Sequence, residues 1–182
     1  FISPKQVAEI RAATKKHTGL YKFEPLMATI PKELGANDAW ECTASHSVNN
    51  RVGSKGSVRT ALNFEGWSTG DRQEKDMWYQ IEFPQSINLS EFHFTSNTTF
   101  KRPAKPTPGV APTMIATYPR VMHVETSVDG LTWNTHVANW KGKEGDNMVS
   151  FDQVKTKFVR LKLGEGLTKE ADEIPWSMRQ VK

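Results

Sequence analysis

Cysteine is nearly absent from this sequence: Cys42 is the one residue of that type among 182. A single cysteine excludes an internal disulfide, so the fold must be stabilised by its hydrophobic core. Tyrosine is also scarce, with three residues, whereas six Trp and nine Phe supply large rings for a core. We expect Cys42 to be a small buried side chain in a strand, on the same face as Trp40 and Ala44.

Long apolar runs are missing as well, since none approaches the ~18 residues of a membrane-spanning helix. The sequence begins at Phe1, without an initiator Met or a signal peptide. We therefore expect a mature fragment or an excised module of a larger protein.

Catalytic motifs are a third absence. The sequence has no Gly-x-Ser-x-Gly elbow, no phosphate-binding Gly-rich loop, no His-Glu-x-x-His and no cysteine pair with zinc spacing. His93 and His123 lie inside predicted strands, where a role in the sheet is favoured over a role as a base. The acidic residues near Trp67 are interleaved with cations, which favours a solvated loop over two opposed catalytic carboxylates. We expect a protein without enzymatic activity.

Positive charge, in contrast, is concentrated. The formal net charge is +4, and residues 97 to 123 hold Lys101, Arg102, Lys105 and Arg120 but no carboxylate. The Pro-rich part of this stretch is long for a strand connection and predicts a loop. Two interpretations stay open: a solvated insertion, or an anion-facing wall in which Arg recognises a carboxylate or a sulfate. Nucleic acid is not an expected partner, because the cations are not interleaved with several stacking rings.

The segment from Tyr118 to Trp133 carries the clearest structural signal. In its first part, Val121, His123 and Glu125 alternate with Met122, Val124 and Thr126. This period of two is what a strand with one buried face requires. Asp129-Gly130 then separates two β-prone runs, and Gly adopts positive φ without steric cost. The segment predicts a strand, a tight turn and a second strand.

Four stretches, taken in order along the chain, resemble motifs of the discoidin family, also called the coagulation factor 5/8 type C domain. They read WECTASHS (40–47), GWSTGDRQEKDMWYQIEF (66–83), YPRVMHVETSVDGLTW (118–133) and KFVRLKLGEG with PWSMRQVK (157–166 and 175–182). Bacterial members of that family include carbohydrate-binding module family 32. The resemblance covers roughly residues 39 to 182 and implies an all-β, antiparallel jelly-roll β-sandwich of the galactose-binding-like type. Vertebrate members usually join their ends by a disulfide, which this chain cannot form, so the resemblance points to a bacterial copy.

Residues 1–38 are expected to form a helical linker or appendage ahead of the sandwich domain, residues 39–182. Ser3 and Pro4 are a typical N-cap and first helical residue, and Gly19 can end the helix. A short helix over about residues 4 to 17 would then join the sandwich to domains further upstream.

The strands are expected to turn at one end of the sandwich, at Pro84–Ser86, Val128–Gly130 and Asp152–Lys155. The opposite end would collect the long loops, at about 46 to 76, 97 to 117, 139 to 147 and 164 to 175. Function in such a scaffold usually lies in the loops.

The expected ligand-binding residues all lie in or beside the long loops. A sugar hydroxyl would be bound by His46, Asn97, Arg102 or Arg120, and a sugar ring would stack on an exposed Trp140 or on Phe100. The other Trp residues that fall on family motifs are expected to pack in the core or at its rim: Trp67, Trp78, Trp133 and Trp176.

The resemblance also raises the question of a structural calcium, which many family members hold in an Asp-Gly-containing loop. This sequence departs from that loop, since residues 61 to 67 read ALNFEGW. We expect no cofactor, and we keep as the less favoured alternative a calcium ion held by Asn63, Glu65 and the more distant Glu173.

The function that the resemblance implies is that of a non-catalytic carbohydrate-binding module in a larger secreted, periplasmic or cell-surface bacterial protein. Its partner would be a glycan, and the basic stretch favours an acidic one. A module that binds a protein or a membrane surface through Val110, Met114 and Ile115 is the first alternative, with the membrane less favoured. A purely architectural domain is the second.

Overall fold

The computed structural model describes residues 38–47, 58–96, 98–101, 113–165 and 174–182. The chain divides into two compact units, Phe1–Glu33 and Leu34–Lys182, and the described residues all belong to the second. The expected N-terminal helix therefore lies outside the described residues. Within the described residues, no helix is long and apolar enough to cross a membrane.

The described residues form nine strands and one short 3-10 helix. In chain order they are β1 (Glu41–Ala44), η1 (Arg59–Leu62), β2 (Trp67–Arg72), β3 (Trp78–Thr95), β4 (Thr98–Lys101), β5 (Thr113–Ala116), β6 (Met122–Ser127), β7 (Asn134–Trp140), β8 (Asp146–Leu163) and β9 (Pro175–Met178). Every strand pair is antiparallel. The predicted all-β sandwich class is confirmed.

The largest sheet has five strands in the order β1-β3-β8-β6-β7, beside two-stranded sheets β2-β9 and β4-β5. One row of paired residues crosses the whole five-stranded sheet: Ala44, Tyr79, Leu161, Val124 and Val137. Three of these side chains are buried, so the row marks the inner face of the sheet.

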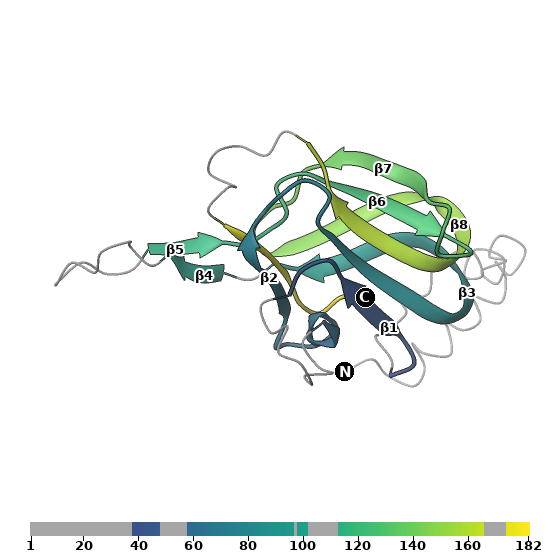
Figure 1. The fold of residues 1–182 in the computed structure, drawn as a ribbon, viewed down its shortest axis with the longest axis horizontal. Coiled ribbons are helices and arrows are strands. Elements are labelled where there is room, and N and C mark those ends of the chain that lie inside the picture. The colour runs from purple at the N-terminus through teal and green to yellow at the C-terminus, as the bar shows by residue number, and fades with distance from the viewer. Residues whose placement is uncertain (1–37, 48–57, 97, 102–112, 166–173) are drawn as a thin grey trace, which may run out of the picture. The chain divides into compact units, whose positions relative to one another are not determined.

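Two strands, β3 and β8, are each 18 residues long. A straight strand of that length would span about 60 Å at ~3.3 Å per residue, so both must bend within a small domain. They curve together (Figure 1), and their register shifts between Glu82 and Ile87. The predicted turns at Pro84–Ser86 and Asp152–Lys155 are wrong in form, because each is a bend inside a continuous strand. Pro84 is tolerated where the ladder is interrupted, since it cannot donate a backbone hydrogen bond.

The bend creates the second layer of the sandwich. The later half of β3 continues to pair with the earlier half of β8, and its free edge meets the end of the chain. There the backbone groups of Thr95 and Arg179 bond each other reciprocally, as do those of His93 and Lys182. The C-terminal residues thereby link β9 to β3.

The predicted turn at Asp129-Gly130 is confirmed, since it joins β6 to β7. Gly130 has φ +75°, which a residue with a Cβ adopts only under strain. Asp129 Oδ1 accepts the backbone N–H groups of Leu131 and Thr132, each at 2.8 Å. These bonds, with one from the Ser127 hydroxyl, lower the pKa of Asp129 from 3.8 to about 2.

The predicted loop from 97 to 117 is a partial error. Its two flanks pair as the hairpin strands β4 and β5, from Thr98 opposite Ala116 to Lys101 opposite Thr113. The flanks do carry β-prone residues such as Thr98, Phe100 and Ile115, but four prolines lie between them, and these indicated a loop.

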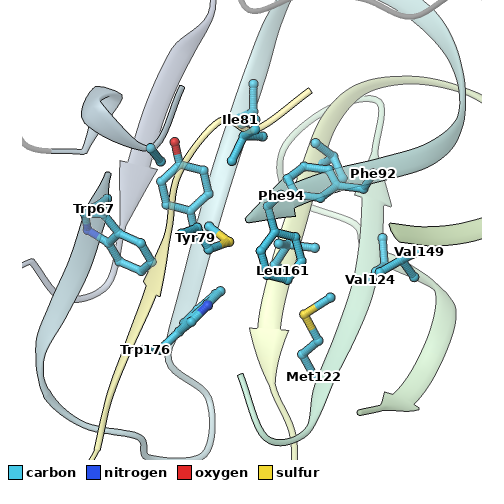
Figure 2. Close-up of a cluster of buried hydrophobic side chains, with 14 of the residues drawn as sticks. Trp67, Tyr79, Ile81, Phe92, Phe94, Met122, Val124, Val149, Leu161 and Trp176 are labelled. Carbon is cyan, nitrogen blue, oxygen red and sulfur yellow. The ribbon is translucent and has the colours of Figure 1, made fainter. Parts of the chain in front are cut away.

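The core lies between the two layers, and Figure 2 shows its central side chains. The Trp67 ring lies 4.9 Å from Tyr79 and 5.1 Å from Trp176, centroid to centroid. Phe92 and Phe94, in the later half of β3, belong to the same core, with ring centroids 6.2 Å apart. Cys42 and Ala44 share the inner face as predicted, but Cys42 is half-buried rather than buried.

Two tryptophans from the family motifs lie on the outer face of the large sheet. The Arg160 guanidinium stacks on Trp133 at 3.6 Å and lies 4.9 Å from Trp78. Its Nε and Nη2 both donate to Gln80 Oε1. These rings cover a cation at the rim, whereas Trp67 and Trp176 are core residues.

Candidate functional site

One end of the large sheet collects the connecting segments. Antiparallel neighbours alternate in direction, so β1, β8 and β7 finish at the end where β3 and β6 begin. We call this the loop end, and it lies at the left of Figure 1. Its described segments are Ser45–Ser47, Gln73–Met77, Thr117–Val121, Lys141–Gly145 and Gly164–Glu165.

Arg120 is fixed at this end by its own neighbours. Its guanidinium lies 3.6 Å from the centroid of the Tyr118 ring. Nη1 donates to the Tyr118 carbonyl at 3.2 Å, and Nη2 donates to the Ala116 carbonyl at 3.1 Å. A guanidinium has five N–H donors, so donors remain for a ligand. Among the described residues, no carboxylate forms a salt bridge with Arg120.

Two ion pairs form at the loop end. Lys162 Nζ lies 2.8 Å from Asp76 Oδ1, and this bond lowers the pKa of Asp76. Lys75 bonds Glu165, which raises the pKa of Lys75 and lowers that of Glu165. The charges of these pairs cancel locally, whereas within the described part of the chain no salt bridge cancels the charge of Arg120, Lys141 or Lys143.

Trp140, the last residue of β7, is half-buried rather than exposed as the sequence suggested. Its ring packs edge-on against Phe94 at 6.3 Å, and it borders the core. The sequence placed it at the start of a loop, but its pairing with Met122 makes it the end of a strand. The residue as a whole keeps intermediate solvent exposure.

The loop after Trp140 is held tightly. Gly145 N–H donates to Ser96 Oγ at 3.0 Å, and Asn147 Oδ1 accepts the Lys143 N–H at 2.9 Å. Gly142 N–H donates to the Pro119 carbonyl at 3.1 Å, which joins this loop to the segment that carries Arg120. A Cβ at position 142 would lie 2.3 Å from that same oxygen, so only glycine fits.

His46 lies at the loop end but apart from Trp140. Its Nδ1 is 3.0 Å from Ser45 Oγ, and Ser45 in turn accepts the Trp78 N–H at 2.8 Å. β1 and β7 are the opposite edges of the five-stranded sheet. Four strand spacings separate them, about 19 Å along the sheet, so one sugar ring cannot touch both residues.

Three predicted site residues cannot be placed. Asn97 and Arg102 lie outside the described residues, and for Phe100 the structure describes only the backbone, in β4. Two residues that sequence reasoning did not select, Tyr118 and Gln73, contact Arg120 directly. Tyr118 lies two residues before Arg120 in the sequence, so a contact between them could have been expected. No sequence signal marked Gln73.

In the loop proposed for calcium, two oxygens are used in hydrogen bonds within the loop and its flank. Asn63 Oδ1 accepts the Glu65 N–H at 2.8 Å, and the Thr60 carbonyl accepts the N–H groups of Asn63 and Gly66. Calcium takes six to eight oxygens, and binding here would compete with these hydrogen bonds. Glu173 lies outside the described residues. No cluster of three His, Cys, Asp or Glu suited to a metal occurs in the described part of the chain.

Comparison with protein-family models and with curated proteins gives no match. Solved structures do match. A CBM32 module from Clostridium perfringens, in complex with GalNAc-β-1,3-galactose, is 17% identical, covers 79% of this chain and 93% of its own, and gives a TM-score of 0.52. Another CBM32 module from Clostridium perfringens is 13% identical over 83% of this chain and 97% of its own, with a TM-score of 0.53.

A chitosan-binding module from a chitosanase/glucanase of Paenibacillus sp. IK-5 is 15% identical, with a TM-score of 0.54. It covers 79% of this chain and 92% of its own. At identities this low, the structural similarity supports a shared arrangement of strands and leaves the choice of ligand open, because the loops diverge first. The chain therefore has the discoidin-like β-sandwich fold seen in the family 32 carbohydrate-binding modules.

Proposed function

We propose that this chain is a non-catalytic carbohydrate-binding module that binds a glycan at the loop end and prefers an acidic or sulfated one. The observation that supports it most directly is Arg120, a guanidinium held on Tyr118 with no carboxylate partner among the described residues. A cation fixed in place and not neutralised is suited to a ligand that brings the anion.

The remaining features of the loop end suit a sugar. Trp140 offers part of a ring beside the segment of Arg120, and the two segments are joined through Gly142 and Pro119. Aromatic rings bind the apolar face of a pyranose, while Arg supplies paired donors to a carboxylate or sulfate. His46 would contact a second ring of an extended glycan, because it lies across the sheet from Trp140.

The proposed setting is a larger secreted bacterial protein. A single shallow site binds weakly, and attachment to further domains raises the effective concentration without new contacts. The sequence lacks the motifs of nucleophilic or metal-assisted hydrolysis, so the module would bind glycans without cleaving them.

The test is calorimetric titration of the whole chain with matched neutral and sulfated oligosaccharides at two ionic strengths. Arg120→Ala should reduce the preference for the sulfated sugar about tenfold, the value of one partly shielded charge-assisted hydrogen bond. Added salt should weaken the wild-type preference, since surface charges are screened over ~10 Å at 0.1 M.

Lys155→Ala provides the matched control. Lys155 is an exposed cation at the bend of β8, away from the loop end, so its removal changes the net charge equally. Its sugar preference should stay that of the wild type. If neither sugar binds, or if both variants lose the preference equally, the proposed function fails.

A further inference from the structure

A glutamine buried beneath the loop end holds Arg120 in place. Gln73 follows β2 and is only 1% exposed. Its Nε2 donates to the Tyr118 carbonyl at 2.8 Å, and its Oε1 accepts the Arg120 backbone N–H at 3.0 Å. Both ends of one side-chain amide are therefore bonded to the segment that carries the cation.

The same residue joins that segment to another part of the chain. The Gln73 backbone N–H donates to the Ile174 carbonyl at 3.0 Å, and Nε2 also lies 3.5 Å from the Pro175 carbonyl. The start of β9 and the Tyr118–Arg120 segment thus meet at one side chain. A buried amide is costly unless both its donor and acceptor are satisfied, and here they are.

The bonds of Gln73 and of the Arg120 guanidinium converge on one atom. The Tyr118 carbonyl accepts both Gln73 Nε2 and Arg120 Nη1. If this carbonyl moves, the guanidinium loses one of its two backbone acceptors. Gln73 therefore acts on the guanidinium twice, through the backbone N–H of Arg120 and through the carbonyl that the guanidinium binds.

We propose that Gln73 is a positioning residue that sets the selectivity of the loop end for anionic glycans by fixing Arg120. The inference rests on the proposed function, because it takes Arg120 to be the group that contacts the anion. Gln73 itself is buried and touches no ligand. A residue that merely stabilised the fold would change affinity for all sugars alike, whereas a positioning residue changes the ratio between sulfated and neutral sugars.

The first variant is Gln73→Met, which keeps the length of the side chain and removes its hydrogen bonds. We expect the preference for a sulfated oligosaccharide over its neutral counterpart to fall about tenfold, as for Arg120→Ala. Combining both changes should lower the preference no further, because the two residues act as one unit.

The second variant is Gln73→Glu, which has nearly the same shape and can be switched by pH. Burial and the facing carbonyl raise the pKa of the new carboxyl above its ordinary value of ~4.3. Protonated, it donates to Tyr118 and accepts from Arg120 as the amide does. As pH rises through the raised pKa, the carboxylate repels the carbonyl and offsets the Arg120 charge. The sulfate preference should be close to wild type at about pH 4.5 and lost at pH 7, while the ligand sulfate stays ionised throughout.

Thr156→Val is the matched control for stability. Thr156 is fully buried near the opposite end and donates its hydroxyl to the Ser127 carbonyl at 2.8 Å. Its loss should lower the melting temperature without changing the sulfated-to-neutral ratio. Hydrogen exchange of the Arg120 amide gives a readout that needs no sugar. Protection of that amide should fall in Gln73→Met and persist in Thr156→Val.

A Gln73→Met protein that keeps the wild-type ratio, or keeps Arg120 amide protection, would overturn the positioning role while leaving the proposed function intact. Loss of the ratio in Thr156→Val as well would also overturn it, since general destabilisation would then explain the effect. If the wild-type protein shows no sulfate preference, the proposed function and the positioning role of Gln73 both fail. Reduced amide protection in Gln73→Met would then show only that Gln73 holds the Arg120 backbone in the fold.

Discussion

The two ends of this sandwich are stabilised in opposite ways. At the turn between β6 and β7, the side-chain hydrogen bonds of Ser127 and Asp129 stay within three residues along the chain. At the loop end, the bonds join residues far apart in sequence, such as Gln73 with Tyr118 and Ser96 with Gly145. The turn is specified locally, whereas the loop end exists only once the two layers have assembled.

The difference also separates stability from binding. A change in the turn alters a short segment whose exposed large hydrophobic side chains are Val128 and Leu131. At the loop end, segments are joined through the Tyr118 carbonyl and through the bond from Gly142 to Pro119. A change there moves the segments that carry Arg120 and Trp140. We therefore expect equal chemical changes at the two ends to have unequal effects on sugar binding, and the predictions below compare matched pairs.

The largest expected difference is between Trp140→Ala and Leu131→Ala. Trp140 is half-buried against Phe94, so its truncation should lower the free energy of unfolding by about 2 kcal/mol, below the ~3–5 of a fully buried ring. Neutral and sulfated sugars should both bind more weakly. Leu131 is 85% exposed, and its truncation should change stability by less than about 0.5 kcal/mol. Urea unfolding measures the stability of both variants, and glycan titration measures their sugar affinity. Equal losses of sugar affinity in Trp140→Ala and Leu131→Ala would contradict the distinction between the two ends.

The second pair is Gly142→Ala and Gly130→Ala. A Cβ at position 142 would press on the backbone oxygen of Pro119, so the two loop segments must separate. Affinity for all sugars should fall about tenfold, or 1.4 kcal/mol. Gly130 has φ +75°, and alanine there should destabilise the fold by about 1 kcal/mol through backbone strain, with the added Cβ also 3.3 Å from the Phe158 ring. Sugar affinity measured well below the melting temperature should be unchanged in Gly130→Ala; any loss there would show that the ends are coupled.

The same contrast explains what the sequence could predict. Asp129-Gly130 and its flanking alternation are local signals, and the turn is where they place it. The sandwich class came from the resemblance of four strand motifs to the discoidin family, and each of those motifs is likewise a local stretch of sequence. The bends in β3 and β8 were read as turns because Pro84 interrupts the pattern, although pairing with a neighbouring strand carries the chain through.

The loop end was harder to predict, because its contacts depend on strand order. Residue spacing along the chain does not show that His46 and Trp140 lie on opposite edges of one sheet. Nor does it show that Gln73 reaches Tyr118 from the other layer. Arg120 was selected for its charge, and its stacking on Tyr118 is a tertiary detail that the composition of the segment does not contain.

A smaller effect is expected at acidic pH from Asp129→Asn. Three hydrogen bonds to its carboxylate, led by the Thr132 N–H, hold the pKa of Asp129 at about 2, against 3.8 ordinarily. A depressed folded-state pKa contributes stability above pH ~4 that is lost as pH falls through about 2. The asparagine variant keeps an acceptor oxygen and does not titrate. Thermal melts from pH 5 to 2 should therefore decline more for the wild type, and parallel curves would contradict this role of the carboxylate.

The smallest expected effect is that of calcium removal. The Asn63–Gly66 loop is closed by local bonds, like the turn, and its oxygens already accept the Glu65, Asn63 and Gly66 N–H groups. A bound ion would stabilise the native state by about 2.7 kcal/mol at 100 times its Kd. We expect the melting temperature to be the same in EDTA and in excess calcium, and Glu65→Gln to behave likewise. A rise with calcium that Glu65→Gln abolishes would show that this loop opens to bind the ion, and that its local closure is weaker than that of the Asp129 turn.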